Sequence, residues 1–338
     1  PVWRIYWSEP LRTQCWTFLG RWAFCVIPRP TEEYIPTAIR HLWCWMYCVR
    51  HWSVQAWMWR AAARWRRWKK GPAVFRRDGR AFSAACVVLA AGGQAGPQFG
   101  TDGSAFALAR MLGHSVAEPY PCLVPLRCAG FPVGLKGVRA NCALSLYLDG
   151  RCAGTERGEV QFAEYGLSGI PAMQLSCLLG PGVKKAGTSV DFFPEMAFPV
   201  LRGMLEQRCA SGMFASLETL LLGLVAKKLG HAILKSCGLQ PLSRAPGSLS
   251  RREVNALAGA LKNWRFAVEG TLPWTQAQVT GGGVPLAEVK TEGCASLRCP
   301  GLYLSGEVLD AAGDCGGFNL QWAWATGIAA GRAAARGL

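Results

Sequence analysis

The sequence contains 15 cysteines but no Cys-x-x-Cys pair and no Cys/His spacing of the kind that binds a metal. Such spacings hold structural zinc or form redox motifs, so their absence predicts no metal site. It also favours free thiols in a reducing cytoplasm over a disulfide-rich secreted protein.

The sequence also lacks any run of about 18 uninterrupted apolar residues, the length that a membrane-spanning helix needs. No Ser/His/Asp set stands out that would indicate nucleophilic catalysis. The 338 residues are 51% hydrophobic and 17% charged, which is typical of a folded protein with room for two compact domains. These features exclude a disordered chain and predict no membrane partner.

Acidic residues are scarce in the first 70 positions, which hold 3 Asp or Glu beside 12 Lys or Arg and 11 of the 15 Trp. Residues 41–70 read HLWCWMYCVRHWSVQAWMWRAAARWRRWKK, and more than half of the formal net charge of +16 comes from positions 1–70. One interpretation is a basic, Trp-rich, non-catalytic module that binds nucleic acid or a membrane surface. Against it, the tryptophans lack a steady helical period and the segment lacks helix caps.

From position 71 onward the composition is that of an ordinary globular protein. Residues 82–93, FSAACVVLAAGG, predict a buried parallel strand that leads into a tight turn at Gly92 and Gly93. Residues 103–116, GSAFALARMLGHSV, predict a helix that ends at Gly113. A strand, glycine turn and helix in this order either bring a cofactor close to the backbone or form a plain structural turn.

The middle of the chain changes pattern twice. Residues 118–176 contain short segments such as ALSLYLDG and GEVQFAEYGLSG, which predict antiparallel strands in a small barrel or sandwich. Residues 194–261 show helical periodicity in three segments, MAFPVLRGMLEQR, SLETLLLGLVAKKLG and SRREVNALAGALKN. The last segment opens with Ser250 and Glu253, the spacing of a capping box.

The C-terminal section, PGLYLSGEVLDAAGDCGGFNLQWAWATGIAAGRAAA, carries the most specific pattern. The strand GLYLSGE places Gly306 and Glu307 at its carboxyl end, where open α/β sheets bind ligands. The glycine loop GDCGG leads into a helix whose first amides, around Phe318 to Leu320, favour an anion or an electron-rich carbonyl edge. Glu307 is suited to accept hydrogen bonds from a ribityl or ribose hydroxyl.

Together, VVLAAGG, GTDGSAFALARMLGHSV, PYPCLVPL and GEVLD…GGFNLQWAW closely resemble the BaiN/aminoacetone-oxidase-type family of FAD-dependent oxidoreductases. The resemblance covers about residues 75–338. It implies an α/β fold in which a partial FAD-binding, Rossmann-like domain is interrupted by a β-barrel-like and a helical insertion. The expected divisions are 1–70 without native fold, 71–117 and 276–338 for the FAD-binding domain, 118–193 for the β-barrel-like insertion and 194–275 for the helical insertion.

The resemblance also implies a cofactor and a site. FAD is the expected cofactor and NAD(P)H the expected co-substrate, with hydride transfer through the flavin to a small organic substrate and no nucleic-acid partner. The motif VTGGGV, residues 279–284, resembles a further turn on the cofactor side. The residues expected to line the flavin end of FAD are Gly92, Gly93, Gly306, Glu307, Gly316, Gly317, Phe318, Asn319, Leu320 and Gln321.

The resemblance offers a second interpretation of the tryptophans. In the shifted reading frame, the codons of residues 43–48, WCWMYC, must spell Val-Leu-Asp-Val-Leu, which matches what the family has there. Residues 1–70 are therefore predicted to be an out-of-frame translation. The chain also lacks the GxGxxG fingerprint that holds the pyrophosphate of FAD. We therefore expect a fragment of a flavin oxidoreductase that binds FAD poorly or not at all, with an inactive pseudogene product as an alternative.

Five further residues are weaker candidates. Cys315 lies in the glycine loop, where it either influences the flavin or simply packs. For His114 and His231 we expect surface, capping or helix-end positions rather than a general base. Asp102 and Asp310 either position loops near the cofactor or are solvated turn residues.

Overall fold

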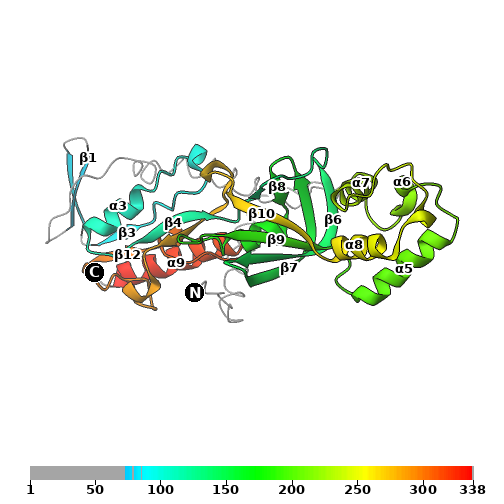
Figure 1. Cartoon of the computed structure of the whole chain (residues 1–338). Coiled ribbons are helices and arrows are strands. Elements are labelled where there is room, and N and C mark those ends of the chain that lie inside the picture. The colour runs from blue at the N-terminus through cyan, green and yellow to red at the C-terminus, as the bar shows by residue number, and fades with distance from the viewer. Residues whose placement is uncertain (1–72, 78–79, 85, 337–338) are drawn as a thin grey trace, which may run out of the picture.

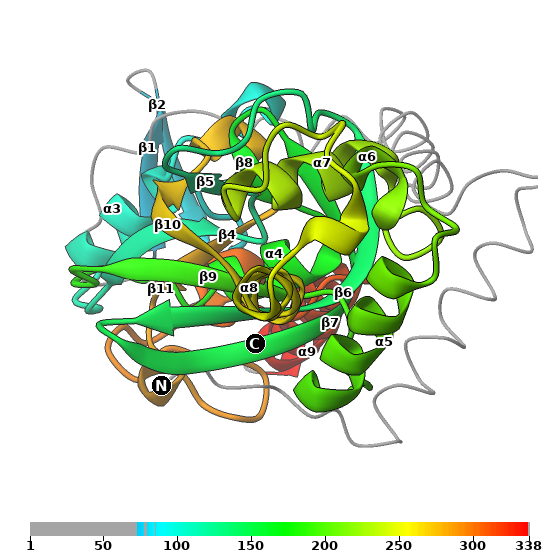
Figure 2. The same ribbon diagram turned by 45° about the vertical axis from the view of Figure 1, so that its right-hand side comes forward.

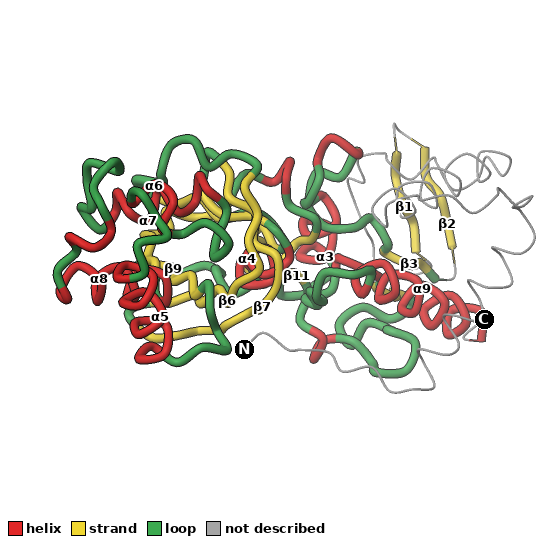
Figure 3. Tube along the Cα trace, turned by 90° about the vertical axis from the view of Figure 1, so that its right-hand side faces the viewer, coloured by secondary structure: helices red, strands yellow, loops and turns green. Residues whose placement is uncertain are grey.

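The computed structural model describes residues 73–77, 80–84 and 86–336, so the predicted out-of-frame segment 1–70 lies outside the described residues. The described part has three regions along its length (Figure 1). Helices α5–α8 lie at one end, a β-barrel lies in the middle, and α3, β3, β12 and α9 lie at the other end. Figure 3 shows the same order from the side, with the β1–β2 hairpin near α9.

The strand predicted over residues 82–93 is shorter than expected. Strands β1 (Ala73–Arg77) and β2 (Arg80–Ala84) form an antiparallel hairpin, and only β3 (Val87–Leu89) pairs in parallel with β12 (Leu302–Leu304). The parallel pairing is confirmed, but its length is limited because β12 has three residues before the chain turns away at residue 306.

Helix α3 (Ser104–Met111) is confirmed, and its end shows why glycine is needed there. Gly113 has a φ of 90°, in the left-handed region that closes a helix, and the amide of His114 bonds back to Ala109 O over 3.0 Å. The buried face of α3, including Phe106, packs in one apolar cluster with β3 and β12. Helix α9 (Phe318–Arg336) lies against the same two strands.

The middle of the chain leaves and returns through one antiparallel pair. Strand β4 (Ala117–Cys122) pairs with β11 (Val279–Gly283), and Cys122 lies opposite Val279. The segments between these two strands form the barrel and the helical region, apart from residues 274–276, which contact the turn after β3. The pair therefore forms a stem that connects the cofactor-side region to the rest of the chain.

The antiparallel segments close into a barrel of six strands in the order β10-β5-β8-β7-β6-β9. Helix α4 (Ile170–Ser176) packs against β7. The α/β class and the barrel insertion are thus confirmed. The strands are β5 (Leu126–Cys128), β6 (Val138–Leu148), β7 (Arg151–Ala163), β8 (Gly166–Ser168), β9 (Ala186–Asp191) and β10 (Trp264–Thr271).

Strand β10 lies within residues 194–275, the range expected to form the helical insertion. Its side chains alternate, with Trp264, Phe266 and Val268 buried in the barrel and their neighbours exposed. The Trp264 ring lies 4.7 Å from the Phe266 ring and 6.3 Å from the Phe162 ring, measured between centroids. An aromatic core formed by residues from both sides of the helical region closes the barrel.

The helical region contains α5 (Phe198–Ala210), α6 (Leu217–Leu220), α7 (Lys227–Ser236) and α8 (Arg251–Lys262), and Figure 2 shows α8 end-on in front of the barrel. One predicted helix divides into α6 and α7 because Gly223 adopts a φ of 80° between them. The capping box of Ser250 and Glu253 is confirmed. Short 3-10 turns are η3 (Pro97–Phe99), η4 (Pro246–Ser248), η5 (Trp274–Gln276), η6 (Leu286–Glu288) and η7 (Gly306–Val308).

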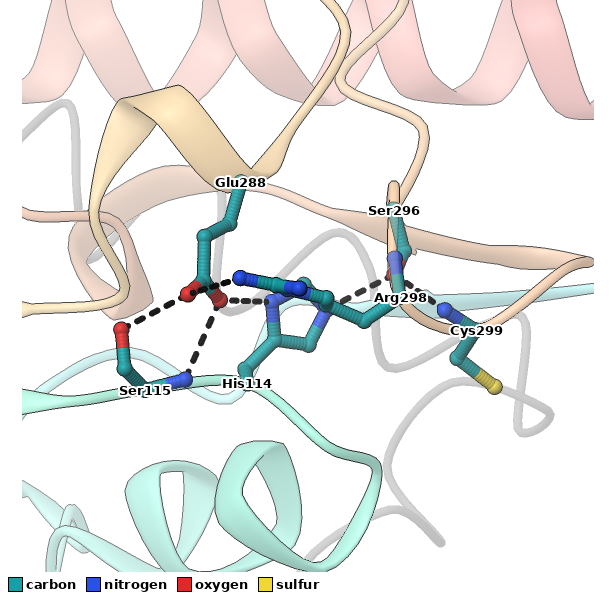
Figure 4. A network of polar contacts seen from close by, with 6 residues as sticks. All are labelled: His114, Ser115, Glu288, Ser296, Arg298 and Cys299. Atoms are coloured by element: carbon teal, nitrogen blue, oxygen red, sulfur yellow. Dashed lines mark hydrogen bonds and ion pairs between the residues drawn. The ribbon is translucent and has the colours of Figure 1, made fainter.

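A buried histidine joins the end of α3 to the loop between β11 and β12 (Figure 4). His114 Nδ1 donates to Glu288 Oε2 over 2.8 Å, and its Nε2 lies 2.7 Å from Ser296 Oγ. The capping position expected for His114 is confirmed through its backbone, but the surface position is wrong, since the residue is only 4% exposed. The ring is buried because both of its nitrogens find partners in the loop.

The partners of His114 are themselves held in place. Glu288 also accepts from the Ser115 amide (3.1 Å), the Ser115 hydroxyl (2.8 Å) and Arg298 Nη2 (3.2 Å). Ser296 Oγ accepts from the amides of Arg298 (3.0 Å) and Cys299 (2.8 Å). A serine, a histidine and a carboxylate thus meet in the order of a catalytic triad. The serine oxygen is buried and occupied by two amides, however, so the group, which we name the His114 clamp, holds the loop in place.

The clamp predicts a pH-dependent stability. Burial alone would raise the pKa of Glu288, but the hydrogen bonds from Ser115, His114 and Arg298 outweigh it and lower the pKa to about 2. A carboxyl with a depressed pKa stabilises the fold above its unfolded pKa, near 4.5, and this contribution is lost as the pH falls toward 2. We expect Glu288→Gln to lower the free energy of unfolding at neutral pH by roughly 1–3 kcal/mol.

Urea unfolding followed by circular dichroism between pH 7 and pH 3 measures this effect. The variant should lose less stability on acidification than the wild type. Glu292→Gln is the matched control, because Glu292 lies exposed in the same loop. Equal pH profiles for Glu288→Gln and the wild type would contradict the assignment.

Candidate functional site

Three segments that are far apart in the sequence meet at Gly93: the turn after β3, strand β11 and the turn η7. Thr280 Oγ1 accepts hydrogen bonds from the amides of Gln94 (2.8 Å) and Ala95 (3.0 Å). The amide of Thr280 donates to Glu307 Oε1 over 2.8 Å. Thr280 therefore ties the turn after β3 to the carboxyl end of β12.

Gly93 fits this junction because it has no side chain. A Cβ at this position would lie 2.6 Å from Glu307 Oε1 and would also collide with Thr280 Oγ1. The carbonyl of Gly93 accepts from the Thr101 hydroxyl and from the amide of Gly103. Space, rather than an unusual backbone conformation, therefore requires glycine at position 93.

Glu307 lies at the centre of this junction. Burial raises the pKa of its carboxyl, and the hydrogen bonds from Thr280 offset this only in part. From its position after β12, Glu307 was expected to accept hydrogen bonds from a ligand hydroxyl. In the structure, Oε1 already accepts from the Thr280 amide, which fixes the direction of the carboxyl group.

Helix α9 holds the residue before Glu307 from the other side. Thr326 Oγ1 accepts from the amide of Gly306 over 2.9 Å, and Trp322 Nε1 donates to Gly306 O over 3.1 Å. Gly306 has a φ of 74°, which glycine adopts without strain. The peptide at the end of β12 is thus fixed by two side chains one turn apart on α9.

The glycine loop before α9 is closed by one amide side chain. Asn319 Oδ1 accepts from the Gly313 amide over 2.8 Å, and Asn319 Nδ2 donates to Gly313 O over 3.0 Å. Gly316 and Gly317 have φ values of 117° and 95°, and a Cβ at Gly317 would meet nothing within 4 Å. The backbone at Gly317 is therefore open where a Cβ would stand, whereas the Phe318 side chain lies against Gly313 and Gly316. The first turn of α9 contains no acidic residue.

The structure brings the predicted site residues together in two groups. Gly93 and Glu307 meet directly, with Gly92 (φ 74°) beside them in the turn. The second group is the start of α9, where Leu320 is 42% exposed. The members of this second group are Gly316, Gly317, Phe318, Asn319, Leu320 and Gln321, with the Gln321 amide bonded to Gly317 O. Gly306 connects the groups, since it precedes Glu307 and bonds to α9.

Sequence reasoning missed the residues that hold these groups together. Thr280, Trp322 and Thr326 are not among the predicted residues, although Thr280 stands inside the VTGGGV motif that was singled out. A threonine in that motif, buried among glycines, was the available signal. Nothing in the local sequence of α9 distinguishes Thr326 from its Ala and Gly neighbours.

The weaker candidates have structural partners. Asp102 Oδ1 accepts from the Ser104 amide over 2.9 Å at the start of α3. The helix-end position expected for His231 is wrong, because the residue lies in the middle of α7. Its Nε2 lies 3.2 Å from the carbonyl oxygen of Glu218 in α6. Burial raises the pKa of Asp310, and a backbone hydrogen bond from Gly282 counteracts this. These contacts account for Asp102 and His231 without a catalytic role.

Between residues 73 and 336, as far as the structure describes them, no group of three or more His, Cys, Asp or Glu is placed to hold a metal ion. Among the helices in that same part of the chain, none is both long and apolar enough to cross a bilayer.

The chain is similar to three characterised proteins. It is 38% identical over 267 residues to a 3-dehydro-bile acid delta(4,6)-reductase of Clostridium scindens, which covers 78% of this chain and 65% of that protein. It is 27% and 29% identical to ribosomal RNA dihydrouridine synthases of Haemophilus influenzae and Escherichia coli, over 72% and 71% of this chain and 58% of each synthase. The chain thus spans about two thirds or less of the length of these relatives.

A match to the HI0933-like protein Rossmann domain covers residues 37–333. It begins inside segment 1–70, so the out-of-frame interpretation finds no support there and stays a prediction. The expected resemblance and the Rossmann-like character of the fold are confirmed. Because the match extends over most of its length, the chain belongs to the HI0933-like Rossmann domain family.

Proposed function

We propose that this chain is part of a flavin-dependent oxidoreductase and that it holds the flavin end of FAD. The observation that carries the proposal is the junction of Gly93, Thr280 and Glu307 together with the open backbone at Gly317 before α9. The junction fixes the direction of the Glu307 carboxyl, and the backbone at Gly317 leaves room for a flat, polar ring system. Family membership and the reductase relative support the same class of reaction.

The residues present fit the flavin end of the cofactor. The first amides of a helix have no partner inside the helix, so those of α9 can donate to an electron-rich edge of a ring. Glu307, held by the Thr280 amide, can accept from a hydroxyl of the cofactor through its second oxygen. When bound, flavin supplies the hydride-transfer chemistry, and the protein supplies position and electrostatics.

The chain offers fewer binding groups for the adenosine end of FAD than for its flavin end. The sequence contains no GxGxxG, the motif whose amides hold the pyrophosphate. We therefore expect the flavin ring and ribityl chain to contribute most of the affinity. FMN and FAD should then bind to this chain with similar dissociation constants.

Flavin titration tests the proposal. Purified chain should quench the fluorescence of added FMN or FAD and shift its absorbance, and Gly93→Ala should weaken binding by about tenfold or more, because a Cβ displaces Thr280 and Glu307. Gly331→Ala is the matched control, since a Cβ at this α9 position meets nothing within 4 Å. Flavin binding that is absent in the wild type, or unchanged in Gly93→Ala, would overturn the assignment.

Thr280→Val isolates one contact in the same site. The substitution keeps the shape but removes Oγ1, which leaves the amides of Gln94 and Ala95 without this acceptor. We expect a loss of roughly 1–3 kcal/mol in the free energy of unfolding and weaker flavin binding. Thr275→Val, at an exposed position in η5, should change neither quantity, as chemical denaturation and the same titration would show.

For the substrate, we infer reduction of a carbon–carbon double bond with NAD(P)H as the source of hydride. A delta(4,6)-reductase and a dihydrouridine synthase both add two hydrogens to such a bond, so the relatives share a reaction although their substrates differ. The chain shares more identity with the reductase, 38% against 27% and 29%, which favours a small organic substrate over RNA.

One assay separates the two substrate classes. Flavin-loaded protein is mixed with NADH or NADPH and either a small conjugated enone or an unmodified RNA that contains uridine. We expect nicotinamide oxidation that depends on the enone and no dihydrouridine in the RNA by mass spectrometry. Dihydrouridine formation with no turnover of the enone would reverse this choice.

A further inference from the structure

Three cysteines from different elements converge beside the stem strands. Cys122 ends β4, Cys177 caps the C-terminus of α4, and Cys315 lies in the glycine loop before α9. Cys122 is fully buried, whereas Cys177 and Cys315 are partly exposed, and all three are free thiols. They share one apolar cluster whose other members are Leu123, Val279, Tyr120, Met173 and Ala312.

Two of these thiols influence each other's ionisation. Cys122 and Cys177 lie in the same small cluster, and each affects the pKa of the other. The surrounding contacts hold the pair in place, because Tyr120 donates to Cys177 O over 3.1 Å and a Cβ at Gly281 would come within 2.5 Å of Cys122 Sγ. The two sulfurs therefore lie in a packed environment that favours one arrangement.

The two thiols are chemically unequal. The neighbouring Cys122 lowers the pKa of Cys177, against the opposing effect of burial. The neighbouring Cys177, together with burial, raises the pKa of Cys122. Because the thiolate is the nucleophilic form, the partly exposed Cys177 is the more reactive of the two.

We propose that Cys177 and Cys122 form a redox-active pair that a hydroperoxide converts into a disulfide. The Cys177 thiolate attacks the outer peroxide oxygen, so an S–O bond forms, the O–O bond breaks, and the leaving alkoxide or hydroxide takes up a proton. Cys122 then attacks the Cys177 sulfur, the S–S bond forms, and the displaced hydroxide leaves as water with the Cys122 proton. Two electrons pass from the two thiols to the hydroperoxide.

Oxidation of the pair would cross-link two elements that already pack together. A disulfide would link β4 to α4, and so the stem strand to the barrel side of the chain. Cys122 also lies against Gly281, the residue after Thr280 in the candidate flavin site. The proposal concerns protein groups alone and needs no bound flavin. Its test is therefore independent of the test of the proposed function.

Peptide mapping tests the proposal on the full chain. The protein is reduced, freed of reductant, exposed to hydrogen peroxide, alkylated and digested with trypsin. Cys122 and Cys177 fall in separate tryptic peptides, 111–127 and 158–184. We expect these two peptides to appear joined and two hydrogens lighter, while peptide 152–157, with the exposed Cys152, remains alkylated.

Two variants sharpen the test. Cys122→Ser keeps a hydrogen-bond donor beside Cys177 but removes the second sulfur, so Cys177 should stop at the sulfenic acid and react with dimedone. Cys152→Ser should leave the linked peptide unchanged. A link between 158–184 and 299–332, which contains Cys299 and Cys315, would overturn the proposed pair. Equal oxidation of Cys152 and Cys177 without any linked peptide would do the same.

Discussion

The close approach of backbone to side chains at Gly93 is the contact on which the candidate site depends. The turn after β3 reaches Thr280 and Glu307 only because residue 93 has no Cβ. Thr280 Oγ1 bonds to the amide of a residue 186 positions earlier in the sequence. The turn, β11 and η7 thereby become one unit.

The stem of β4 and β11 makes this contact possible. The barrel and the helical region leave the cofactor-side region at Cys122 and return at Val279, which lie opposite each other. An insertion of this size therefore does not displace Thr280 from the turn after β3. The apolar cluster around Cys122 and Val279 buries the base of the stem next to the site.

Two polar groups fix the remaining loops. The His114 clamp attaches the loop between β11 and β12 to the end of α3, and Asn319 closes the glycine loop onto the start of α9. In both places a side chain satisfies buried or partly buried polar atoms that the loop cannot satisfy by itself. The glycine loop is thereby held in place while the backbone at Gly317 stays open where a Cβ would stand.

The sequence by itself determined the features that neighbouring residues control. Gly113 follows the end of α3, and the capping box of Ser250 begins α8. Alternating and helical periodicity distinguished most of the barrel strands from the helices. Only the tertiary structure decided that β10 closes the barrel, that His114 is buried and that Thr280 joins Gly93 to Glu307. Each of these features depends on contacts between residues that lie far apart along the chain. A local sequence pattern does not identify such contact partners.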